Sequence, residues 1–387
     1  MDSANRKNLA FSHNHSLGQF VCKCNDPTLA AMKDVCRARV AWKEVMAAST
    51  PLPETVASEV EFPPNDLALQ PSGKTNTANL TQPARVRLEV PETVGSRMMW
   101  GYLLTFIALH LMLLLAFVPA LFSWTGLLLV PLGLYLFDWV GIGLCYHRTL
   151  THAGLVMPKW FEHTCAVLGV CTLMDSPARW VAIHRKHHQH SDEQPDPHSP
   201  LVSFMWGHFG WLIRRDDESN AAGFYHQYAP DILRDPFYLK LERNVMWAWI
   251  YVAHAIAFFL VGFVVGWVGN GLQEGLRFGA SLFVWGVVVR TLFTWHVTWA
   301  VNSVAHMWGY RNYQTRDNSR NSWLVALFTG GEGWHNNHHA HPVSAAHGHR
   351  WWEFDPTYWT ICFLSWVGLA KEVKTYHTGR VRTADPN

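Results

Sequence analysis

Long apolar segments constrain the fold of this chain more than any other feature. The first runs from Met98 to Cys145 and is interrupted by His110 and Asp138. A single helix of that length would measure about 72 Å at ~1.5 Å per residue, whereas a bilayer core is about 30 Å thick. The segment therefore predicts two membrane spans that form a hairpin, with its turn at 119–123.

A second apolar pair follows at 246–268 and 278–301, joined by a short glycine-containing loop at 269–276. All spans are expected to be helical, because lipid offers no partner to an unpaired backbone group. The predicted fold class is an all-α integral membrane protein with four transmembrane helices in two hairpins. Their expected positions are about 98–118, 123–145, 246–268 and 278–301.

The Lys and Arg residues indicate the orientation in the membrane. Of 31 such residues, 29 lie before the first span, between the two hairpins or after the fourth span. The positive-inside rule then places both termini and segment 145–246 in the cytoplasm, or in the stroma of a plastid. The net charge of only +2 argues against a nucleic-acid partner.

The regions outside the spans differ in composition. Residues 1–95 are polar and rich in Pro, Ser, Thr and Asn, so we expect an N-terminal extension that is partly disordered, with one short helix near 29–47. Residues 96–375 form the predicted membrane domain, and 376–387 form a C-terminal tail. The seven Cys residues show no regular spacing and are interpreted as reduced thiols or buried apolar residues.

Histidines cluster in four groups at the predicted cytoplasmic boundary. One group has the spacing H-x-x-x-x-H, two have H-x-x-H-H, and a single histidine lies four residues after Asn302. Residues i, i+3 and i+4 share one face of a helix, so we expect each H-x-x-H-H to direct three imidazoles at one point. The members are His147 and His152; His184, His187 and His188; His306; and His335, His338 and His339.

These nine imidazoles exceed what one tetrahedral zinc site uses, and imidazole also suits iron, copper and nickel. A single histidine of this kind is more often a surface residue than a ligand, but four groups at one boundary favour ligation. We therefore predict a site for two metal ions, each with room for an exogenous ligand. Other histidines, among them His110, His208 and His254, are interpreted as structural.

These motifs resemble those of the membrane fatty acid desaturases of the delta-9 acyl-CoA and acyl-lipid type. The likeness extends from about Gly101 to Leu369. It implies a cytosolic helical cap, two iron ions per chain held by the nine histidines, and Asn302 as a partner through a water molecule. It also places Thr298 and Trp299 near the bend of an acyl tunnel. The similar segments are H-R-T-L-T-H at 147–152, H-R-K-H-H-Q-H-S-D at 184–192, T-W-A-V-N-S-V-A-H at 298–306 and G-E-G-W-H-N-N-H-H at 331–339.

The resemblance also implies the reaction and its partners. O2 and two external electrons would introduce a cis double bond, of the delta-9 type, into a saturated fatty acyl chain carried on CoA or on a lipid. The His-Pro-Gly-Gly motif of a fused cytochrome b5 does not occur in the sequence, so the electrons are expected from a separate ferredoxin or cytochrome b5. The expected location is a bacterial inner membrane, or an endoplasmic reticulum or plastid membrane, with the active site on the cytoplasmic face.

Carboxylates near the histidine motifs are candidates for orienting the imidazoles, since a metal-bound histidine usually donates its other N–H to a carboxylate or carbonyl. Asp192 and Glu332 lie inside the motifs and are the favoured pair. Arg290 falls inside the fourth span, where a charge is costly, and is interpreted as buried and paired. The other carboxylate candidates are Asp175, Asp196 and Asp355.

Two other functions fit parts of this pattern. A hydroxylase of the same membrane di-iron class would use an identical ligand set and differ in its product. A membrane metal transporter or metal sensor is expected to place its ligands at mid-membrane depth, whereas these motifs lie at the boundary. A soluble-type carboxylate di-iron site is disfavoured, because it needs two Glu-x-x-His helices and only Glu332 and His335 have that spacing.

Overall fold

The computed structural model describes residues 86–376, and four helical stretches in this range are long and apolar enough to cross a membrane. Their number and order agree with the four predicted spans. The predicted extension up to residue 85, with its helix near 29–47, and the tail from residue 377 lie outside the described residues. The four stretches are Trp100–Phe117, Trp124–Thr151, Pro236–Trp267 and Gly271–Met307.

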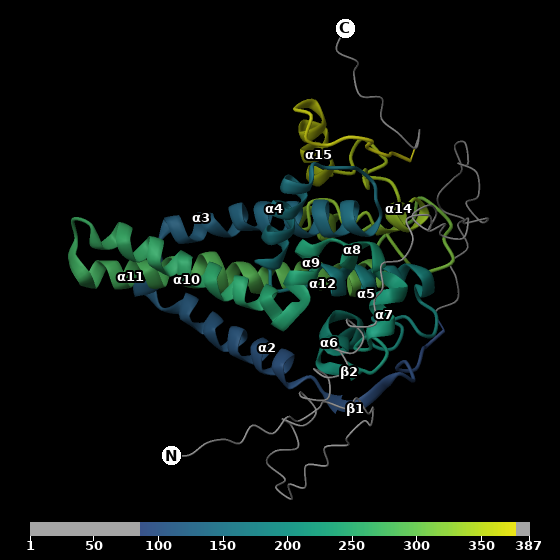
Figure 1. Cartoon of the computed structure of the whole chain (residues 1–387), viewed down its shortest axis with the longest axis horizontal. Helices are drawn as coiled ribbons and strands as arrows, with labels where there is room; N and C mark the ends of the chain where they lie inside the picture. The colour runs from purple at the N-terminus through teal and green to yellow at the C-terminus, as the bar shows by residue number, and fades with distance from the viewer. Residues whose placement is uncertain (1–85, 377–387) are drawn as a thin grey trace, which may run out of the picture. The chain divides into compact units, whose positions relative to one another are not determined.

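Each stretch consists of consecutive helical elements (Figure 1). The first contains α2 (Trp100–Leu113) and η4 (Leu114–Phe117), and the second contains α3 (Trp124–Gly133) and η6 (Leu134–Thr151). The third ends with α10 (Met246–Trp267), and the fourth contains α11 (Gly271–Phe283), η9 (Val284–Val289) and α12 (Arg290–Met307). Both η6 and η9 are π-helical, a geometry that is frequent near functional sites.

The two hairpin turns differ in how well the sequence predicted them. The first lies where expected: η5 (Pro119–Leu121) forms the turn, and the Ser123 hydroxyl accepts a hydrogen bond from a backbone N–H of the first turn of α3. The loop predicted at 269–276 is wrong, because α11 already begins at Gly271. Gly269 and Gly271 have φ angles of +87° and +84°, which let the chain reverse within a few residues.

The second and fourth spans extend further than predicted, to Thr151 and Met307 instead of 145 and 301. The added residues are polar, so hydropathy alone ends the spans too early. They remain helical because they are buried in protein rather than in lipid: Arg148 is 1% exposed and His306 is 0% exposed. These extensions carry the predicted ligands His147 and His306.

The expectation of an all-α chain needs one correction within residues 86–376. Strand β1 (Val94–Met98) pairs antiparallel with β2 (Arg214–Asp216), so the predicted domain boundary at 95/96 falls inside a strand. Neither strand shows the alternation of apolar and polar residues that identifies a strand in a sequence. The pair anchors the start of α2, because the Met99 N–H donates to the Ile213 carbonyl at 2.9 Å.

Shorter helices gather at one end of the long ones and form a cap (Figure 1). Within it, α4 packs closely on η6: a Cβ atom added to Gly141 would lie 2.4 Å from the backbone nitrogen of Gly169. The cap elements are α4 (Lys159–Val170), α5 (Pro177–His190), η7 (Trp206–Gly210), α6 (Trp211–Ile213), α7 (Ala222–Tyr228), α8 (Pro230–Arg234), α9 (Pro236–Glu242), α13 (Trp323–Phe328), α14 (His335–Ala340) and α15 (Pro356–Trp366).

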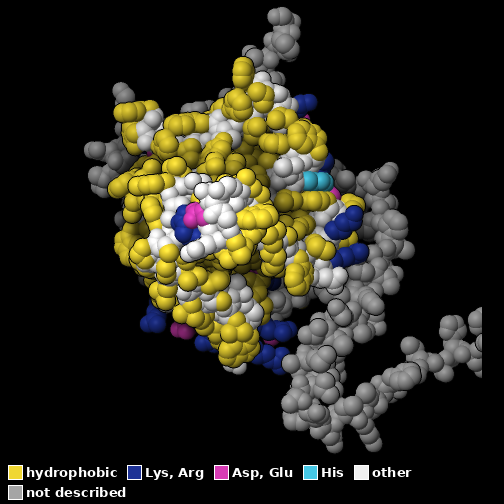
Figure 2. All heavy atoms as spheres, turned by 90° about the vertical axis from the view of Figure 1, so that its left-hand side faces the viewer, with side chains coloured by type: hydrophobic (Ala, Val, Ile, Leu, Met, Phe, Trp, Pro, Cys, Tyr) yellow, Lys and Arg dark blue, Asp and Glu magenta, His cyan; other side chains and the backbone are white. Residues whose placement is uncertain are grey.

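The long helices expose apolar side chains over most of their surface. Only 6% of the apolar window in the first stretch and 11% in the third is buried by protein. Figure 2 looks at the end of the long helices and shows hydrophobic side chains over most of that face, with most Lys and Arg side chains toward its edges. A continuous apolar surface of this size indicates contact with lipid.

Two polar side chains inside the spans pair with other protein groups. The Arg290 guanidinium is fully buried and donates to the Cys171 carbonyl at 2.8 Å, in agreement with its interpretation as buried and paired. Asp138 accepts a hydrogen bond from the Thr298 hydroxyl at 3.1 Å. The four cysteines in the described residues form no disulfide, and three of them are buried.

Candidate metal centre

The structure brings the nine predicted histidines together in two groups. Within each group the potential ligand nitrogens lie within 4.8 Å of one another. We call these the five-histidine group and the four-histidine group. The first consists of His147, His152, His184, His188 and His338, and the second consists of His187, His306, His335 and His339.

Each H-x-x-H-H motif contributes to both groups. On α5, His184 and His188 belong to the five-histidine group, whereas His187 belongs to the four-histidine group. The division is reversed on α14, where only His338 joins the five-histidine group. The expectation that a motif directs all three imidazoles at one point is therefore wrong. Consecutive helix residues differ by about 100° around the axis, so neighbouring histidines face two different centres.

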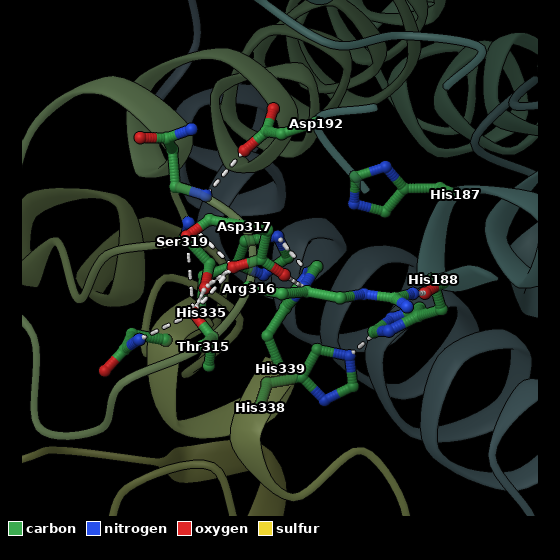
Figure 3. A network of polar contacts seen from close by, with 12 residues as sticks. His187, His188, Asp192, Thr315, Arg316, Asp317, Ser319, His335, His338 and His339 are labelled. Atoms are coloured by element: carbon green, nitrogen blue, oxygen red, sulfur yellow. Dashed lines mark hydrogen bonds and ion pairs between the residues drawn. The ribbon is translucent and has the colours of Figure 1, made fainter. Parts of the chain in front are cut away.

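Four carboxylates hold imidazoles from outside the groups. The Nδ1 atoms of His187, His306 and His339 lie 3.0, 2.9 and 2.5 Å from oxygens of Asp196, Asp192 and Asp317. His147 Nδ1 also contacts Glu332. The favoured pair, Asp192 and Glu332, thus contacts one histidine of each group. Figure 3 shows Asp317 and Asp192 beside the histidines of α5 and α14.

The other two carboxylate candidates contact different partners. Asp175 accepts a hydrogen bond from the Tyr102 hydroxyl. Asp355 lies 2.9 Å from the guanidinium of Arg148, which also donates to Glu332. Arg148 therefore keeps Glu332 in place, whereas within residues 86–376 neither Asp175 nor Asp355 forms a hydrogen bond with any of the nine histidines. In the sequence, nothing separates Asp175 and Asp355 from Asp196, which does contact a histidine.

Burial favours the neutral form of most imidazoles in the two groups, whereas at His306 the neighbouring Asp192 outweighs burial and raises the pKa. Burial, reinforced by neighbouring histidines, holds the pKa of His184, His188 and His338 well below the ordinary value. Burial alone would raise the pKa of Asp317, but the nearby His339 holds it well below its usual range. Neutral imidazole is the form that binds a metal ion.

The hydrogen bonds also show that the four-histidine group fits a cation. His306 and His339 direct Nδ1 at carboxylates, so in the neutral form each carries a lone pair on Nε2. Both of these Nε2 atoms lie 3.0 Å from Nε2 of His335, which has at most one hydrogen to offer. Nε2 of His187 is buried without a hydrogen-bond partner. A metal ion at the centre would satisfy these lone pairs.

An apolar cavity adjoins the five-histidine group. His184 reaches its wall, and Thr298, Trp299 and Asn302 also line it. Its apolar lining suits a long apolar ligand that passes close to the histidines. The other lining residues are Tyr102, Phe106, Leu173, Met174, Asp175, Trp180, Ile183, His198, Phe209, Trp211, Leu212, Ile213 and Trp295.

Two residues of the site gave no signal in the sequence, and a third, His347, stood out only as a histidine near the motifs. Asp317 lies in a polar loop, and His198 and His347 lie outside the spaced motifs. In the structure His347 is 0% exposed, with Nδ1 3.3 Å from Glu332, and His198 is 2% exposed, with Nδ1 3.9 Å from Asp196. Their burial beside the carboxylates could be found only from the fold.

Comparison with known proteins places this architecture in a family. The family model described as "Fatty acid desaturase" matches residues 122–361. The chain belongs to the fatty acid desaturase family. The matched segment contains all nine histidines and the four carboxylates that contact them.

Relatives of this desaturase are named for several substrates. An "sn-1 stearoyl-lipid 9-desaturase" of Synechocystis sp. is 40% identical over 275 residues, which cover 71% of this chain and 80% of the relative. A "Palmitoyl-monogalactosyldiacylglycerol delta-7 desaturase, chloroplastic" of Arabidopsis thaliana is 37% identical, with 71% and 68% coverage. An "Acyl-CoA C20 Delta5-desaturase" of Anemone leveillei is 38% identical, with 69% and 78% coverage. The chain is thus an oxidoreductase of lipid metabolism and, with its four apolar helices, a membrane protein.

Proposed function

We propose that this desaturase introduces a cis double bond at the delta-9 position of a saturated fatty acyl chain, with two iron ions held by the nine histidines. The observation that carries this proposal is the pair of histidine groups beside an apolar cavity. The balanced reaction is R–CH2–CH2–R′ + O2 + 2 e− + 2 H+ → R–CH=CH–R′ + 2 H2O. Iron supplies the redox chemistry with O2 that an unactivated methylene requires.

The side chains around the metal ions have separate tasks. The nine imidazoles bind the ions, and Asp192, Asp196, Asp317 and Glu332 fix the imidazole tautomers. Asn302 lies one helical turn before His306 on α12 and faces the cavity, so we assign it to the four-histidine group through a water molecule. That arrangement leaves a position for an exogenous ligand between protein and substrate.

The cavity determines which carbons react. An acyl chain that lies between Trp180, Trp295 and Trp299 has little freedom to slide along the cavity. The same carbons therefore stay next to the metal ions, and this proximity favours their reaction. The Thr298 hydroxyl donates a hydrogen bond to Asp138, and this bond holds the cavity wall in place next to the reacting carbons. The delta-9 assignment rests on the lipid 9-desaturases among the relatives, and the acyl carrier is a membrane lipid or CoA.

We assign the cap and both termini to the cytoplasmic face, because 29 of 31 Lys and Arg residues lie on that side of the four spans. The substrate then enters at the membrane surface, where α2 begins beside the cavity residue Tyr102. The electrons come from a separate carrier, ferredoxin or cytochrome b5.

The test combines product analysis with metal analysis. The chain is expressed in a host that lacks delta-9 products, and lipids are profiled by mass spectrometry with the double bond located. The wild type should form delta-9 cis products and contain two irons per chain, whereas H188A should lose the products. H226A, which changes an exposed histidine on α7, is the matched control. A hydroxylated acyl chain as sole product, or fewer than two irons in active protein, would contradict the proposal.

A further inference from the structure

One edge of the histidine groups approaches solvent. Of the nine histidines in the two groups, eight are buried, and His188 is the partly exposed exception. An external electron carrier must come close to the metal ions, because electron transfer slows steeply with distance. The surface over His188 is therefore where a carrier protein outside the membrane can come closest to the metal ions.

An exposed arginine covers this edge. Arg316 donates to the carbonyl oxygens of His188 and Gln189, at 2.9 and 2.6 Å, and its side chain reaches the surface. The next residue, Asp317, accepts a hydrogen bond from His339. Figure 3 shows Arg316 extending between His339 and His188. The dipeptide 316–317 thus contacts both histidine groups from the solvent side.

The charge at this edge indicates the kind of partner. Gln189 and Gln314 are exposed and neutral, and Arg316 supplies a positive charge that contacts the backbone of a ligand residue. Glu193, an exposed acid just beyond the end of α5, would oppose an acidic partner. An electrostatically complementary carrier would therefore place acidic side chains on Arg316 and avoid Glu193.

We propose that Arg316 and the exposed edge of His188 form the docking surface for an acidic one-electron carrier protein, an inference that rests on the proposed function. Two reduced carriers would dock in turn and give up one electron each, which accounts for the two electrons that one turnover requires. The competing explanation is structural: arginine near the C-terminus of α5 satisfies free carbonyls and stabilises the helix.

Kinetics with a protein donor test the docking surface. R316E and R316K are assayed with reduced plant-type ferredoxin and with the soluble domain of cytochrome b5, both acidic carriers. For at least one donor, R316E should lower kcat/KM by about tenfold or more and weaken its dependence on salt, while R316K stays near the wild type. E193K should raise kcat/KM for the same donor. R234E, which changes an exposed arginine on α8, is the matched control.

A second measurement separates docking from structure. The protein is reduced chemically without O2, and one turnover is then started with O2 and substrate. R316E should keep its iron content and single-turnover yield. Loss of iron and of this yield in parallel with donor kinetics would show that Arg316 acts as a helix cap. Unchanged donor kinetics in R316E would place docking elsewhere. Failure of the wild type in single turnover would instead refute the proposed function.

Discussion

Asp317 lies outside the histidine motifs, yet we expect metal binding by the histidines to depend on its carboxylate. Its carboxylate lies 2.5 Å from His339 Nδ1 and also accepts hydrogen bonds from Ser319. Asparagine has the same shape but no charge, so D317N should leave His339 less basic. We expect metal affinity of the four-histidine group to fall by about 10–100-fold, so that iron content measured by mass spectrometry drops toward one per chain.

The matched control for this prediction is D217N, which neutralises an exposed aspartate that pairs with Arg215. D217N should keep both irons. If D317N also retains two irons and full activity, the carboxylate has no part in holding the metal ions.

At this scale the sequence predicted the histidines but not all their partners. The histidines repeat at helical spacing and could be found from that periodicity. Asp317 and His198 reach the site from loops, and a loop carries no period that indicates where a side chain will lie. Asp192 and Glu332 could be selected because they lie inside the motifs. Asp175, Asp196 and Asp355 could not be ranked from the sequence, and of these only Asp196 contacts one of the nine histidines in the described residues.

At the scale of helices, the contact between η6 and α4 positions the first predicted ligand, His147. Gly141 and Gly169 let the two backbones touch, and Tyr146 packs against the same glycine of α4. G141A would place a methyl group against backbone atoms that cannot move aside. We expect it to lower the free energy of unfolding by about 1–3 kcal/mol and to lower iron content, because His147 lies six residues further along η6.

Thermal unfolding in detergent, followed by tryptophan fluorescence, measures this effect. G101A is the matched control, since a Cβ atom there meets no other atom within 4 Å, and its effect should stay within about 0.5 kcal/mol. Equal unfolding temperatures for G141A and G101A would mean that the helices can separate without cost.

Elements were predicted best where one physical signal dominates. The four spans follow from hydropathy and bilayer thickness alone. The ends of the second and fourth spans were misplaced because their last turns, around Arg148 and His306, are polar and buried in protein. The pairing of β1 with β2 could not be predicted, because Arg214–Asp216 carries no strand pattern and its partner lies more than a hundred residues away.

At the scale of the whole molecule, the proposed orientation puts the cap and the α10–α11 turn on opposite sides of the membrane. The exposed residue Asn270 lies in that turn, and the exposed residue Gln314 lies in the cap near the histidine groups. N270C should react with a membrane-impermeant maleimide in intact bacterial cells. Q314C should react only after the membrane is permeabilised, because the cytoplasmic face is closed to the reagent.

Native thiols have to be removed before this labelling experiment. Cys362 is exposed, whereas Cys145, Cys165 and Cys171 are buried. The two variants are therefore made with Cys22, Cys24, Cys36 and Cys362 changed to serine, and this background alone is the unlabelled control. Labelling of Q314C but not N270C in intact cells would reverse the orientation. Labelling of both would mean that the α10–α11 hairpin does not cross the membrane. Contact with lipid could then no longer explain its apolar surface.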